Sequence, residues 1–594
     1  MLKTLVQALL RRAGGSASNA PEADAGAGPN RLHLYITQAA GCAAAGDHAA
    51  AADLYRKCLQ LHPQNARIWC NFGAELDATG QTQEAERAYR RALELDAAPA
   101  QAWYNLGRLL QEQGRAAESE SCYRAAAALV DAGANRQLWL LLYNNWGLLL
   151  CHQGRPREAV ALYREALAEY AEAADLRSNL LLTMQYVDGC TPAESFAEHL
   201  AYAQHFEAPL KGNWLAHPNS RESGKRLKVG YVSPDFRAHA VAFFIEPVLA
   251  QHDREQIEVY CYYNHSVSDE TTHRLRSLVE HWRDISAIDD DAGAKLIRDD
   301  GIDILVDLAG HTAGGRLQMF ARKPAPVQVT WLGYPCTSGL SAMDYRISDA
   351  YADPVGISEC NYSEILYRLP DTFDCYRPPQ DSPEVGALPA IAQGGITFGS
   401  FNNLAKLSAE VRALWAQVLL AVPGSRLLLK TAALADAATR QRLIDNFGER
   451  GVGAERLILA SADATYSEHL NRYNQVDIGL DPFPYNGTTT SFEAIWMGVP
   501  VVTLAGNSFV SRMGAGMLIN LGMAELVAPT PQGYVATAAR LAGDLGRLAA
   551  LRAGLRRRLA DSVLTDAKRF THNLEKAYRE MWANWCAGSQ DDAR

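Results

Sequence analysis

A 34-residue period in the first third of the chain constrains its fold more than any other feature. The residues that recur at this step are the glycines Gly46, Gly80 and Gly114, the tyrosines Tyr55, Tyr89 and Tyr123, and the tryptophans Trp69 and Trp103. A fixed period of this length is typical of helical repeats, each of which buries its apolar face only against its neighbours. This region is therefore expected to form a stacked array without chemistry of its own.

The period is broken once, by an insertion. The step from Gly114 to Gly154 is 40 residues, and extra residues around 131–137 account for the difference as a longer loop. From Asn145 to Asn179 the step is 34 again, which predicts a further half-repeat.

Each unit carries a large residue and a glycine in a first helix, a glycine at a turn, and a tyrosine in a second helix. This is the tetratricopeptide pattern, in which a large residue of the first helix packs against an aromatic residue of the second and small residues let the helices approach. Pro63 and Pro99 are expected to end helices, because proline cannot continue the hydrogen-bond ladder. An alanine-rich helical bundle is the alternative, which four units in register disfavour. The groove of such an array most often binds an extended polypeptide.

Size and charge limit the classes of protein to which the chain can belong. Its 594 residues exceed a single hydrophobic core and indicate about three or four domains. A net charge of −10 argues against nucleic-acid binding, which normally uses a basic face, and leaves protein partners open. The 11 cysteines include no Cys-x-x-Cys pair, and no apolar run reaches the length of a membrane span. We therefore expect a cytoplasmic protein without a membrane segment.

Short β-branched runs alternate with helical stretches after residue 225. The expected strands are 227–232, 257–263, 302–308 and 327–332, followed by 396–401, 426–429, 457–459, 476–480, 499–504 and 526–527. This alternation favours two doubly wound parallel sheets, which the proline- and glycine-rich stretch 376–395 divides. Ligands of such sheets bind past the carboxyl ends of the strands.

Common nucleotide-binding motifs do not occur in either series of strands. The segments 451–453 and 514–516 lack the third glycine of a dinucleotide fingerprint, and the sequence contains no P-loop, which excludes a P-loop ATPase. Three consecutive aspartates, 289–291, are interpreted as the solvated start of a helix rather than as a metal site.

Four polar segments follow expected strands. The first presents His239, the second is the glycine-rich run 308–316, and the third is the hydroxyl-rich exit 331–339. The fourth, 481–493, has a glycine and three threonines before a helix, where backbone N–H groups and the positive helix end hold an anion such as a diphosphate. Lys406 follows the first strand of the second series, where a cation neutralises a leaving diphosphate without a metal.

Each of these residues also has a plainer interpretation. A lone histidine is more often structural, a lysine is usually a solvated surface charge, and a threonine-rich helix start is usually an N-cap. Their shared position past strand ends favours a common site. Glu493 then stands where it can accept hydrogen bonds from ribose hydroxyls, and Asp307 is a reserve candidate for a proton relay beside a structural role.

Taken together, the segments resemble the glycosyltransferases that include the nucleocytoplasmic O-GlcNAc transferases and the SPINDLY-type protein O-fucosyltransferases of plants. The resemblance covers nearly the whole chain and rests on Gly-His-Thr at 310–312, the run 324–335, Phe-Asn-Asn-Leu-Ala-Lys at 401–406 and Gly-Thr-Thr-Thr at 487–490. It implies an α-helical tetratricopeptide superhelix followed by a GT-B fold, which is a pair of Rossmann-like α/β lobes. It also implies an inverting enzyme that needs no metal.

The resemblance assigns roles to single residues. The catalytic candidates are His239, as base or acceptor-side group, and Lys406, at the donor diphosphate. The candidates for donor binding are Asn403, Lys406, Ala464, His469, Arg472, Thr488, Thr489, Thr490 and Glu493, of which His469 and Arg472 surround the uracil. The candidates near the sugar and the acceptor are His311, Thr312, Leu332 and Gly333. The resemblance implies no metal ligand and no cofactor beyond the nucleotide sugar, which is a substrate.

The sequence also departs from the animal enzymes. Thr488 stands where they carry a histidine, Asn403 replaces a glutamine and Glu493 replaces an aspartate, while two motifs look closer to the fucosyl branch. The predicted reaction transfers GlcNAc from UDP-GlcNAc to Ser or Thr hydroxyls of proteins or peptides that the repeats present. GDP-fucose-dependent O-fucosylation and a non-enzymatic repeat scaffold are the alternatives. Since no acidic pair follows a strand beside the threonines, the residues predict metal independence as well.

These patterns give the expected domains. They are an N-terminal segment and flexible linker at 1–30, tetratricopeptide repeats at 31–190, a helical connector at 191–225, an N-terminal catalytic lobe at 226–378, an interlobe linker at 379–395, and a C-terminal catalytic lobe with the nucleotide site at 396–594. The first segment lacks a secretory core, and its Gly-, Ala- and Ser-rich part has little to bury.

Overall fold

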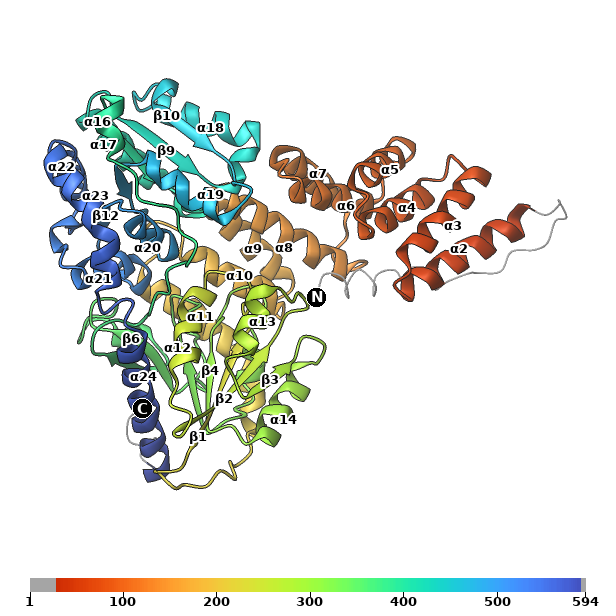
Figure 1. Ribbon diagram of the computed structural model, residues 1–594. Coiled ribbons are helices and arrows are strands. Elements are labelled where there is room, and N and C mark those ends of the chain that lie inside the picture. The colour runs from red at the N-terminus through yellow and green to blue at the C-terminus, as the bar shows by residue number, and fades with distance from the viewer. Residues whose placement is uncertain (1–27, 589–594) are drawn as a thin grey trace. The chain divides into compact units, whose positions relative to one another are not determined.

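The computed structural model describes residues 28–588, and Figure 1 shows its helices and strands. The expected linker, residues 1–30, lies outside this range except for its last three residues, which begin a helix. The chain divides into a compact unit that ends at Leu149 and a second that begins at Leu150. The helices of the first unit are α2 (Gly28–Ala44), α3 (His48–Leu61), α4 (Ala66–Ala78), α5 (Thr82–Leu95), α6 (Ala100–Glu112), α7 (Ala116–Leu129) and most of α8 (Arg136–His152).

Glycines form the turns of the repeats. Gly46, Gly80 and Gly114 have φ angles of 83°, 79° and 74°, a region in which residues with a Cβ are strained. After the first of these turns, the carboxylate of Asp47 accepts a hydrogen bond from the N–H of Ala50 at 3.0 Å and caps α3. The 34-residue period therefore reflects one glycine turn with a positive φ in each repeat, at which one helix ends and the next begins.

A second set of glycines lets the two helices of a repeat approach. A Cβ on Gly73 would lie 2.8 Å from the ring of Tyr89, and one on Gly107 would lie 2.8 Å from the ring of Tyr123. Both tyrosines are fully buried. The prediction that small residues let the two helices of a repeat approach is thus confirmed.

The second unit begins with helices that pack on the first sheet. They are α9 (Pro156–Glu169), α10 (Ala174–Met184), α11 (Pro192–Phe206) and the short helix η1 (Ala208–Asn213). Leu181 of α10 and Tyr202 of α11 share a buried apolar cluster with Tyr262 and Leu305 of the sheet. The last helical repeat is therefore part of the same unit as the α/β lobes.

The first lobe is built on a seven-stranded parallel sheet with the order β3-β2-β1-β4-β5-β6-β7. Its strands are β1 (Leu227–Ser233), β2 (Ile257–Tyr263), β3 (His281–Asp284), β4 (Ile304–Asp307), β5 (Val327–Thr330), β6 (Tyr345–Asp349) and β7 (Ile365–Leu369). Its helices are α12 (Ala242–Gln251), α13 (Glu270–Arg276), α14 (Asp290–Asp300) and α15 (Leu317–Phe320). Val229 of β1 lies between Val259 of β2 and Ile304 of β4, and all three are fully buried. The inner strands thus form an apolar centre of the sheet.

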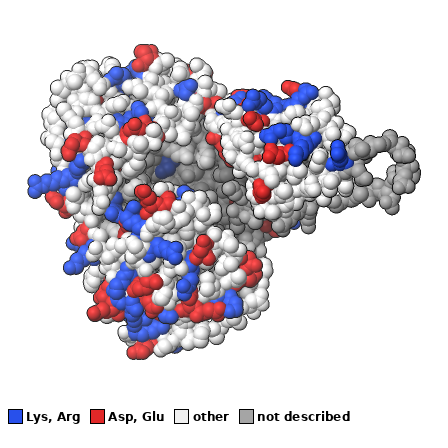
Figure 2. Space-filling view, turned by 45° about the vertical axis from the view of Figure 1, so that its right-hand side comes forward, with Lys and Arg blue, Asp and Glu red and all other residues white. Residues whose placement is uncertain are grey.

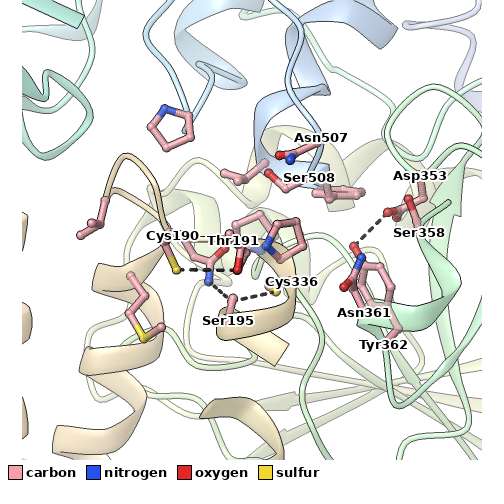
Figure 3. Close-up of a pocket in the computed structure, with 18 residues that line it drawn as sticks. Cys190, Thr191, Ser195, Cys336, Asp353, Ser358, Asn361, Tyr362, Asn507 and Ser508 are labelled. Carbon is pink, nitrogen blue, oxygen red and sulfur yellow. Dashed lines mark hydrogen bonds between the residues drawn. The ribbon is translucent and has the colours of Figure 1, made fainter. Parts of the chain in front are cut away.

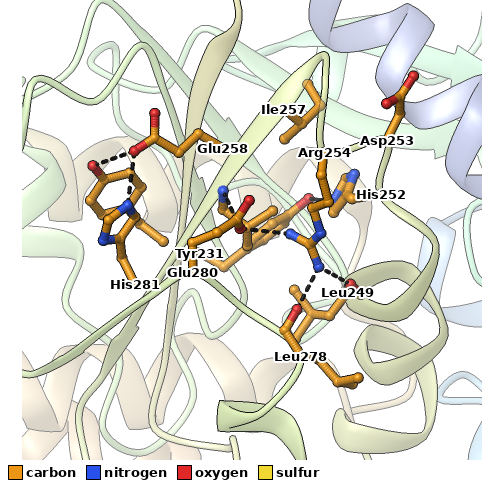
Figure 4. Close-up of polar contacts among 12 residues, drawn as sticks. Tyr231, Leu249, His252, Asp253, Arg254, Ile257, Glu258, Leu278, Glu280 and His281 are labelled. Atoms are coloured by element: carbon orange, nitrogen blue, oxygen red, sulfur yellow. Dashed lines mark hydrogen bonds and ion pairs between the residues drawn. The ribbon is translucent and has the colours of Figure 1, made fainter.

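Three strands of this sheet, β3, β6 and β7, are not among the expected strands. β3 and β7 form the edges and are only partly buried. Polar contacts hold the β3 edge, as Figure 4 shows: His281 pairs with Glu258 at 2.8 Å, and Arg254 pairs with Glu280 at 2.9 Å. β6 is fully buried but contains Arg346, which donates to backbone carbonyl groups. Polar residues mask the apolar periodicity of these strands, so the sequence pattern does not reveal them.

The second lobe is built on a six-stranded parallel sheet with the order β10-β9-β8-β11-β12-β13. Its strands are β8 (Thr397–Ser400), β9 (Arg426–Lys430), β10 (Leu457–Ala460), β11 (Ile478–Leu480), β12 (Val501–Leu504) and β13 (Val527–Ala528). Its helices are α16 (Pro389–Gln393), α17 (Ala409–Ala421), α18 (Ala437–Gly448), α19 (Tyr466–Asn471), α20 (Thr489–Trp496), α21 (Met513–Asn520), α22 (Pro531–Ala542) and α23 (Leu545–Ala560). Repeats followed by two parallel α/β sheets confirm the predicted fold class.

The final helix, α24 (Ala567–Ala587), packs on the first sheet rather than on the second. Phe570 and Trp582 of α24 are buried in the apolar core of the first lobe, and Figure 1 shows the helix beside that lobe. The expected C-terminal lobe, residues 396–594, is therefore too long at its end, because α24 belongs to the core of the other lobe.

The chain consequently crosses between the lobes twice. The two crossings lie side by side, since the N–H of Tyr376 donates to the carbonyl oxygen of Leu564 at 2.8 Å. Tyr376 also stacks on Phe492 of α20, with ring centroids 4.7 Å apart, and Phe244 of α12 contacts both rings. Aromatic packing thus joins the lobes beside the crossings.

The acidic run that follows β3 starts a helix, as expected. Asp289 caps α14, while Asp290 and Asp291 pair with Arg316 and Arg322, each at 2.6 Å. No cluster of three or more His, Cys, Asp or Glu side chains among residues 28–588 is arranged to hold a metal ion. The aspartates therefore serve the helix start and its neighbours.

Charged side chains of both signs are interspersed over the face shown in Figure 2. All 11 cysteines are unpaired. Of the helices that the structure describes, none combines the length and the apolar character needed to cross a bilayer.

Candidate active site

His239, His311, Lys406 and the threonines follow the strands at which the order of each sheet reverses. In the first sheet these strands are β1 and β4, and in the second they are β8 and β11. Loops from two such neighbouring strands diverge to opposite faces of the sheet and leave a crevice in which ligands bind. The segments 401–406 and 481–493 meet at this point of the second sheet, and we call the site that they form the Lys406 crevice.

Lys406 joins these two segments. Its ammonium group donates to the carbonyl oxygen of Asn486 at 2.8 Å and lies 4.2 Å from the centroid of the Tyr485 ring. Burial lowers the pKa of Lys406 to about 8, and the carboxylate of Asp481 opposes this shift. A carbonyl dipole and an aromatic face compensate a half-buried cation only in part, so the ammonium group is suited to an anionic ligand.

Helix α20 begins beside Lys406 without a side-chain cap. The hydroxyl of its N-cap residue, Thr488, contacts the sulfur of Met513 at 3.3 Å instead of a helix N–H. The hydroxyl of Thr490 donates to Asn402 Oδ1 at 3.0 Å and ties the helix start to the segment after β8. The first N–H groups of a helix need acceptors from outside the helix and favour anions, so this start is suited to a phosphate.

Gly487 and Asp481 shape the turn before α20. A Cβ on Gly487 would lie 2.6 Å from the hydroxyl oxygen of Thr490, so the turn has no room for a side chain. The carboxylate of Asp481 accepts hydrogen bonds from the N–H of Gly487 at 2.6 Å and the hydroxyl of Thr503 at 2.7 Å. These contacts fix the backbone that leads into Thr489, the first residue of the helix.

The residues assigned to the base by resemblance form a linked set. The ammonium group of Lys430, the last residue of β9, contacts Nδ1 of His469. Because an ammonium group only donates, Nδ1 is the acceptor and the ring hydrogen is on Nε2. Nε2 donates this hydrogen to the carboxylate of Glu493 at 2.9 Å. Arg472 donates to Asp463 at 3.0 Å, and its hydrogen bonds hold the pKa of Asp463 well below the ordinary value. Lys430 also pairs with Asp463 at 2.7 Å, which joins the two groups. Lys430 and Asp463 were not among the predicted residues, although Lys430 ends a strand.

Glu493 is more enclosed than its predicted role at a ribose requires. It is buried, and its carboxylate also accepts hydrogen bonds from two tyrosine hydroxyls, of which that of Tyr466 lies at 2.7 Å. A ribose hydroxyl at this carboxylate would have to replace one of these donors. Asn403 is exposed and accepts a hydrogen bond from the N–H of Ala405 at 3.0 Å, while Ala464 is exposed in the loop before α19.

His239 lies just before α12, at the junction of the lobes. Its Nδ1 is 3.5 Å from the carboxylate of Asp235 and 3.3 Å from the backbone nitrogen of Val241. Burial lowers the pKa of His239 below its ordinary value, and Asp235 opposes this shift. Phe243, on the following helix, stacks on Tyr466 of the second lobe at 5.6 Å. A neutral, partly exposed imidazole at this junction is suited to accept a proton.

His311 is placed differently from the expected position in the cleft. It is 1% exposed, its Nε2 binds the carbonyl oxygen of Ser338 at 2.9 Å, and its Nδ1 lies 3.1 Å from the hydroxyl of Ser178 on α10. Aromatic rings of α11 pack on it, and burial lowers its pKa well below the ordinary value. His311 is therefore a neutral contact between the first lobe and α10. In the same loop, Thr312 donates to the carbonyl oxygen of Ala309 at 2.7 Å.

The loop that contains Leu332 and Gly333 is strained and lies between the lobes. Leu332 has a φ of 73°, which is rare for a residue with a branched side chain and is found mostly where function maintains it. Its side chain packs against the apolar cores of both lobes. A Cβ on Gly333 would lie 1.9 Å from the carbonyl oxygen of Leu308, so the loop is pressed against the exit of β4. The role of these two residues near a sugar stays a prediction.

An acidic pair lies beside the threonines, contrary to the sequence analysis. Asp349, the last residue of β6, and Asp374 line a cavity of about 10 Å³ together with Gly487 and Thr488. The expectation of no such pair is wrong because the sequence pattern does not reveal β6. Asp349 accepts hydrogen bonds from three backbone N–H groups, and burial raises the pKa of Asp374 to about 7. Because Asp349 already accepts three backbone hydrogen bonds and Asp374 is partly protonated, the pair is poorly suited to bind a metal ion.

A larger cavity, of about 40 Å³, lies where α10 and α11 meet both lobes (Figure 3). Its wall includes Cys190 and Ser195 from the helical segment, Cys336 from the first lobe and Ser508 from the second. The hydroxyl of Ser195 lies 3.8 Å from the sulfur of Cys336. None of the predicted site residues is among the described residues that line this cavity, which is therefore distinct from the Lys406 crevice.

Comparisons with known proteins agree with this arrangement. Residues 208–376 and 387–574 match the model of glycosyl transferase family 41, and residues 32–75, 66–99 and 99–172 match tetratricopeptide repeat models. A solved structure, of a mutant of the Thermobaculum terrenum O-GlcNAc transferase, is similar with a TM-score of 0.76 at 36% identity. The match covers 95% of this chain and 100% of that chain.

Curated relatives carry names of the same kind. The chain is 40% identical over 420 residues to SPINDLY of Petunia hybrida, named a probable UDP-N-acetylglucosamine–peptide N-acetylglucosaminyltransferase, with 70% of this chain and 45% of that protein covered. It is 29% identical over 491 residues to the UDP-N-acetylglucosamine–peptide N-acetylglucosaminyltransferase of Caenorhabditis elegans, with 63% and 42% covered. The chain thus spans less than half the length of these relatives. Because the family 41 model matches more than half of the chain, the chain belongs to glycosyl transferase family 41.

Proposed function

We propose that this chain is a protein glycosyltransferase that transfers N-acetylglucosamine from UDP-N-acetylglucosamine to Ser or Thr hydroxyls, with inversion and without a metal. The observation that carries the proposal is the meeting of Lys406 with the uncapped start of α20 at the point where the order of the second sheet reverses. A half-buried cation, a helix start without a side-chain cap and threonine hydroxyls are the groups that a diphosphate needs.

The reaction in this proposal is a single in-line displacement. The acceptor hydroxyl oxygen forms a bond to the anomeric carbon as the bond from that carbon to the diphosphate oxygen breaks. Lys406, Thr489 and Thr490 stabilise the negative charge that develops on the leaving UDP. His239 receives the hydroxyl proton, and the carboxylate of Asp235 beside its Nδ1 stabilises the imidazolium that forms.

The donor is assigned from the relatives and stays a proposal. The names of the curated relatives and of the solved structure refer to N-acetylglucosamine, which supports UDP-N-acetylglucosamine. GDP-fucose is the second candidate, because Thr488 replaces the histidine of the animal enzymes and two motifs, at 310–312 and 401–406, look closer to the fucosyl branch.

The acceptor in this proposal is a protein held by the repeat groove, since helical repeats of this kind bind extended polypeptides. The compartment in this proposal is the cytoplasm, which the 11 unpaired cysteines support.

A donor panel tests the proposal. Purified full-length chain is incubated with acceptor peptides and each of several UDP- and GDP-sugars, and transfer is followed by intact mass while UDP and GDP binding is measured by calorimetry. The proposal predicts a mass increase of one N-acetylhexosamine with UDP-N-acetylglucosamine. A deoxyhexose increase with GDP-fucose alone would assign the fucosyl activity instead. A folded chain that transfers no sugar but still binds the peptides would be a repeat scaffold.

A further inference from the structure

The last helical repeat contacts the Lys406 crevice at two separate places. Gly154, in the turn before α9, lies against the short helix η3 (Leu404–Lys406), so that a Cβ on it would be 3.0 Å from the carbonyl oxygen of Leu404. Tyr186, just after α10, stacks on Tyr485 of the segment before α20, with ring centroids 4.8 Å apart and an interplanar angle of 16°. The repeat therefore touches both segments that Lys406 joins.

Tyr485 connects this stack to the ammonium group of Lys406. The Nζ atom lies 4.2 Å from the centroid of Tyr485, so the Tyr485 ring contacts both Tyr186 and the cation. The electrons of an aromatic face attract a cation, and the attraction grows as water is removed. A second ring stacked on Tyr485 holds its orientation and excludes water, both of which keep the cation in place.

Polar contacts fix the repeat at the same edge of the second lobe. Arg157 of α9 donates to the carbonyl oxygen of Asp188 at 2.7 Å and pairs with Glu410, in the first turn of α17, at 3.3 Å. Glu410 lies only four residues after Lys406. The repeat thus contacts the second lobe both before Lys406 in the sequence, at Leu404, and after it, at Glu410. These contacts limit the freedom of the Tyr186–Tyr485 stack.

We propose that Tyr186 is a positioning residue for Lys406, so that the last repeat is a structural part of the donor site and not only an arm that holds the acceptor. The inference rests on the proposed role of Lys406 at the diphosphate. If Tyr186 acts only through Lys406, replacing it must have no further effect once the lysine is gone. A tyrosine that merely fills space between the repeat and the second lobe would act independently of the lysine.

A double-mutant cycle in the full-length chain distinguishes these cases. UDP and GDP affinities are measured by calorimetry for the wild type, Tyr186→Leu, Lys406→Ala and the double variant, with kcat and KM for the active proteins. We expect Tyr186→Leu to weaken diphosphate binding by about 3- to 10-fold, as for the loss of a partly desolvated cation–π arrangement. We expect no further weakening in the Lys406→Ala background. Tyr186→Phe keeps the stack and is expected to restore wild-type affinity.

Two further variants guard against loss of fold. Tyr170→Leu, at a partly buried tyrosine at the end of α9, is the matched control and is expected to bind UDP like the wild type. Tyr485→Leu removes the connecting ring and is expected to reproduce Tyr186→Leu, again without effect beside Lys406→Ala. Thermal melting shows which variants are folded.

The outcomes separate this inference from the function on which it rests. Wild-type affinity in folded Tyr186→Leu, or an equal loss with and without Lys406, overturns the inference alone, provided that Lys406→Ala itself weakens binding. A wild-type chain that binds neither nucleotide overturns the proposed function and the inference with it.

Discussion

The ammonium group of Lys406 donates to the carbonyl oxygen of Asn486 at 2.8 Å, two residues before the N-cap of α20. This contact holds a positive charge at a helix start that lacks a side-chain cap. Both features favour the same ligand, an anion, and neither requires a metal.

The first prediction is that Lys406→Ala abolishes most sugar transfer while leaving the fold intact. Removing a group that stabilises the developing charge of the leaving group costs about 10²–10³ in kcat. Turnover and thermal melting of the variant are compared with those of Lys295→Ala, a control at an exposed lysine of α14 that should behave like the wild type. Wild-type turnover in folded Lys406→Ala would remove the lysine from the mechanism.

The second prediction concerns pH. The pKa of Lys406 is about 8, so its charge is present below that pH and is lost as the pH rises through it. We expect kcat/KM to fall about tenfold per pH unit above this value, whereas a bound diphosphate favours the charged form and moves the corresponding limb of kcat to higher pH. Burial raises the pKa of Tyr485, which faces the lysine, and of Tyr186, which stacks on Tyr485, so neither titrates in this range. Asp481, with a pKa of about 6, acts on the acid side.

Lys406→Arg is the control for this limb. A guanidinium stays charged throughout the range, so any residual activity of the variant should lose the limb near pH 8. Retention of the same limb in Lys406→Arg would assign it to another group.

The third prediction is that EDTA leaves transfer unchanged. The acidic pair beside the threonines is poorly suited to a divalent cation, because backbone N–H groups occupy Asp349 and burial keeps Asp374 partly protonated near neutral pH. Initial rates are measured with EDTA, with added Mg²⁺ and with added Mn²⁺. Activity that disappears with EDTA and returns with either metal would contradict the proposed mechanism.

The fourth prediction tests the packing of the repeats. Gly73→Ala places a Cβ 2.8 Å from the ring of Tyr89 and should destabilise the repeats by about 1–3 kcal/mol through overpacking. Gly41→Ala is the matched control, because a Cβ there has nothing within 4 Å and alanine favours a helix by about 1 kcal/mol. Urea unfolding followed by circular dichroism measures both. A Gly73→Ala protein as stable as Gly41→Ala would mean that the helices adjust without cost.

The fifth prediction separates the repeats from the donor site. Deletion of residues 1–130 ends between α7 and α8 and keeps α8 to α10, the last of which packs on the first sheet. We expect UDP or GDP affinity to stay close to that of the full-length chain while transfer to protein acceptors falls sharply and transfer to short peptides falls less. Equal transfer to protein acceptors by both chains would give the repeat groove a different partner.

The sequence was most informative where a conformation or an environment requires one type of residue. The period of glycines predicted the turns because positive φ angles need glycine, and the small residues of each repeat predicted that its helices approach closely. Apolar runs likewise revealed the inner strands of both sheets, since strands buried on both faces are continuously hydrophobic. The positions past those strands then led to Lys406 and the threonines.

Sequence reasoning failed where polar groups are satisfied by distant partners. β6 contains Arg346 and ends at Asp349, and both side chains find backbone partners that no local pattern discloses. Because β6 was not predicted, the acidic pair of Asp349 and Asp374 was not predicted either. His311 stands in a loop that suits a ligand, yet Ser178, 133 residues earlier in the chain, occupies its ring nitrogen. Lys430 could have been predicted as a site residue, because it ends a strand.

The two neighbouring crossings between the lobes have a mechanical consequence. Because Tyr376 and Leu564 are hydrogen-bonded to each other, both connections lie at one place, about which one lobe could turn against the other. A rotation about this place would stretch neither connection, and its largest displacement would fall on the side farthest from Tyr376. The rings of Tyr376, Phe492 and Phe244 lie beside that place, so such a rotation would leave their packing intact.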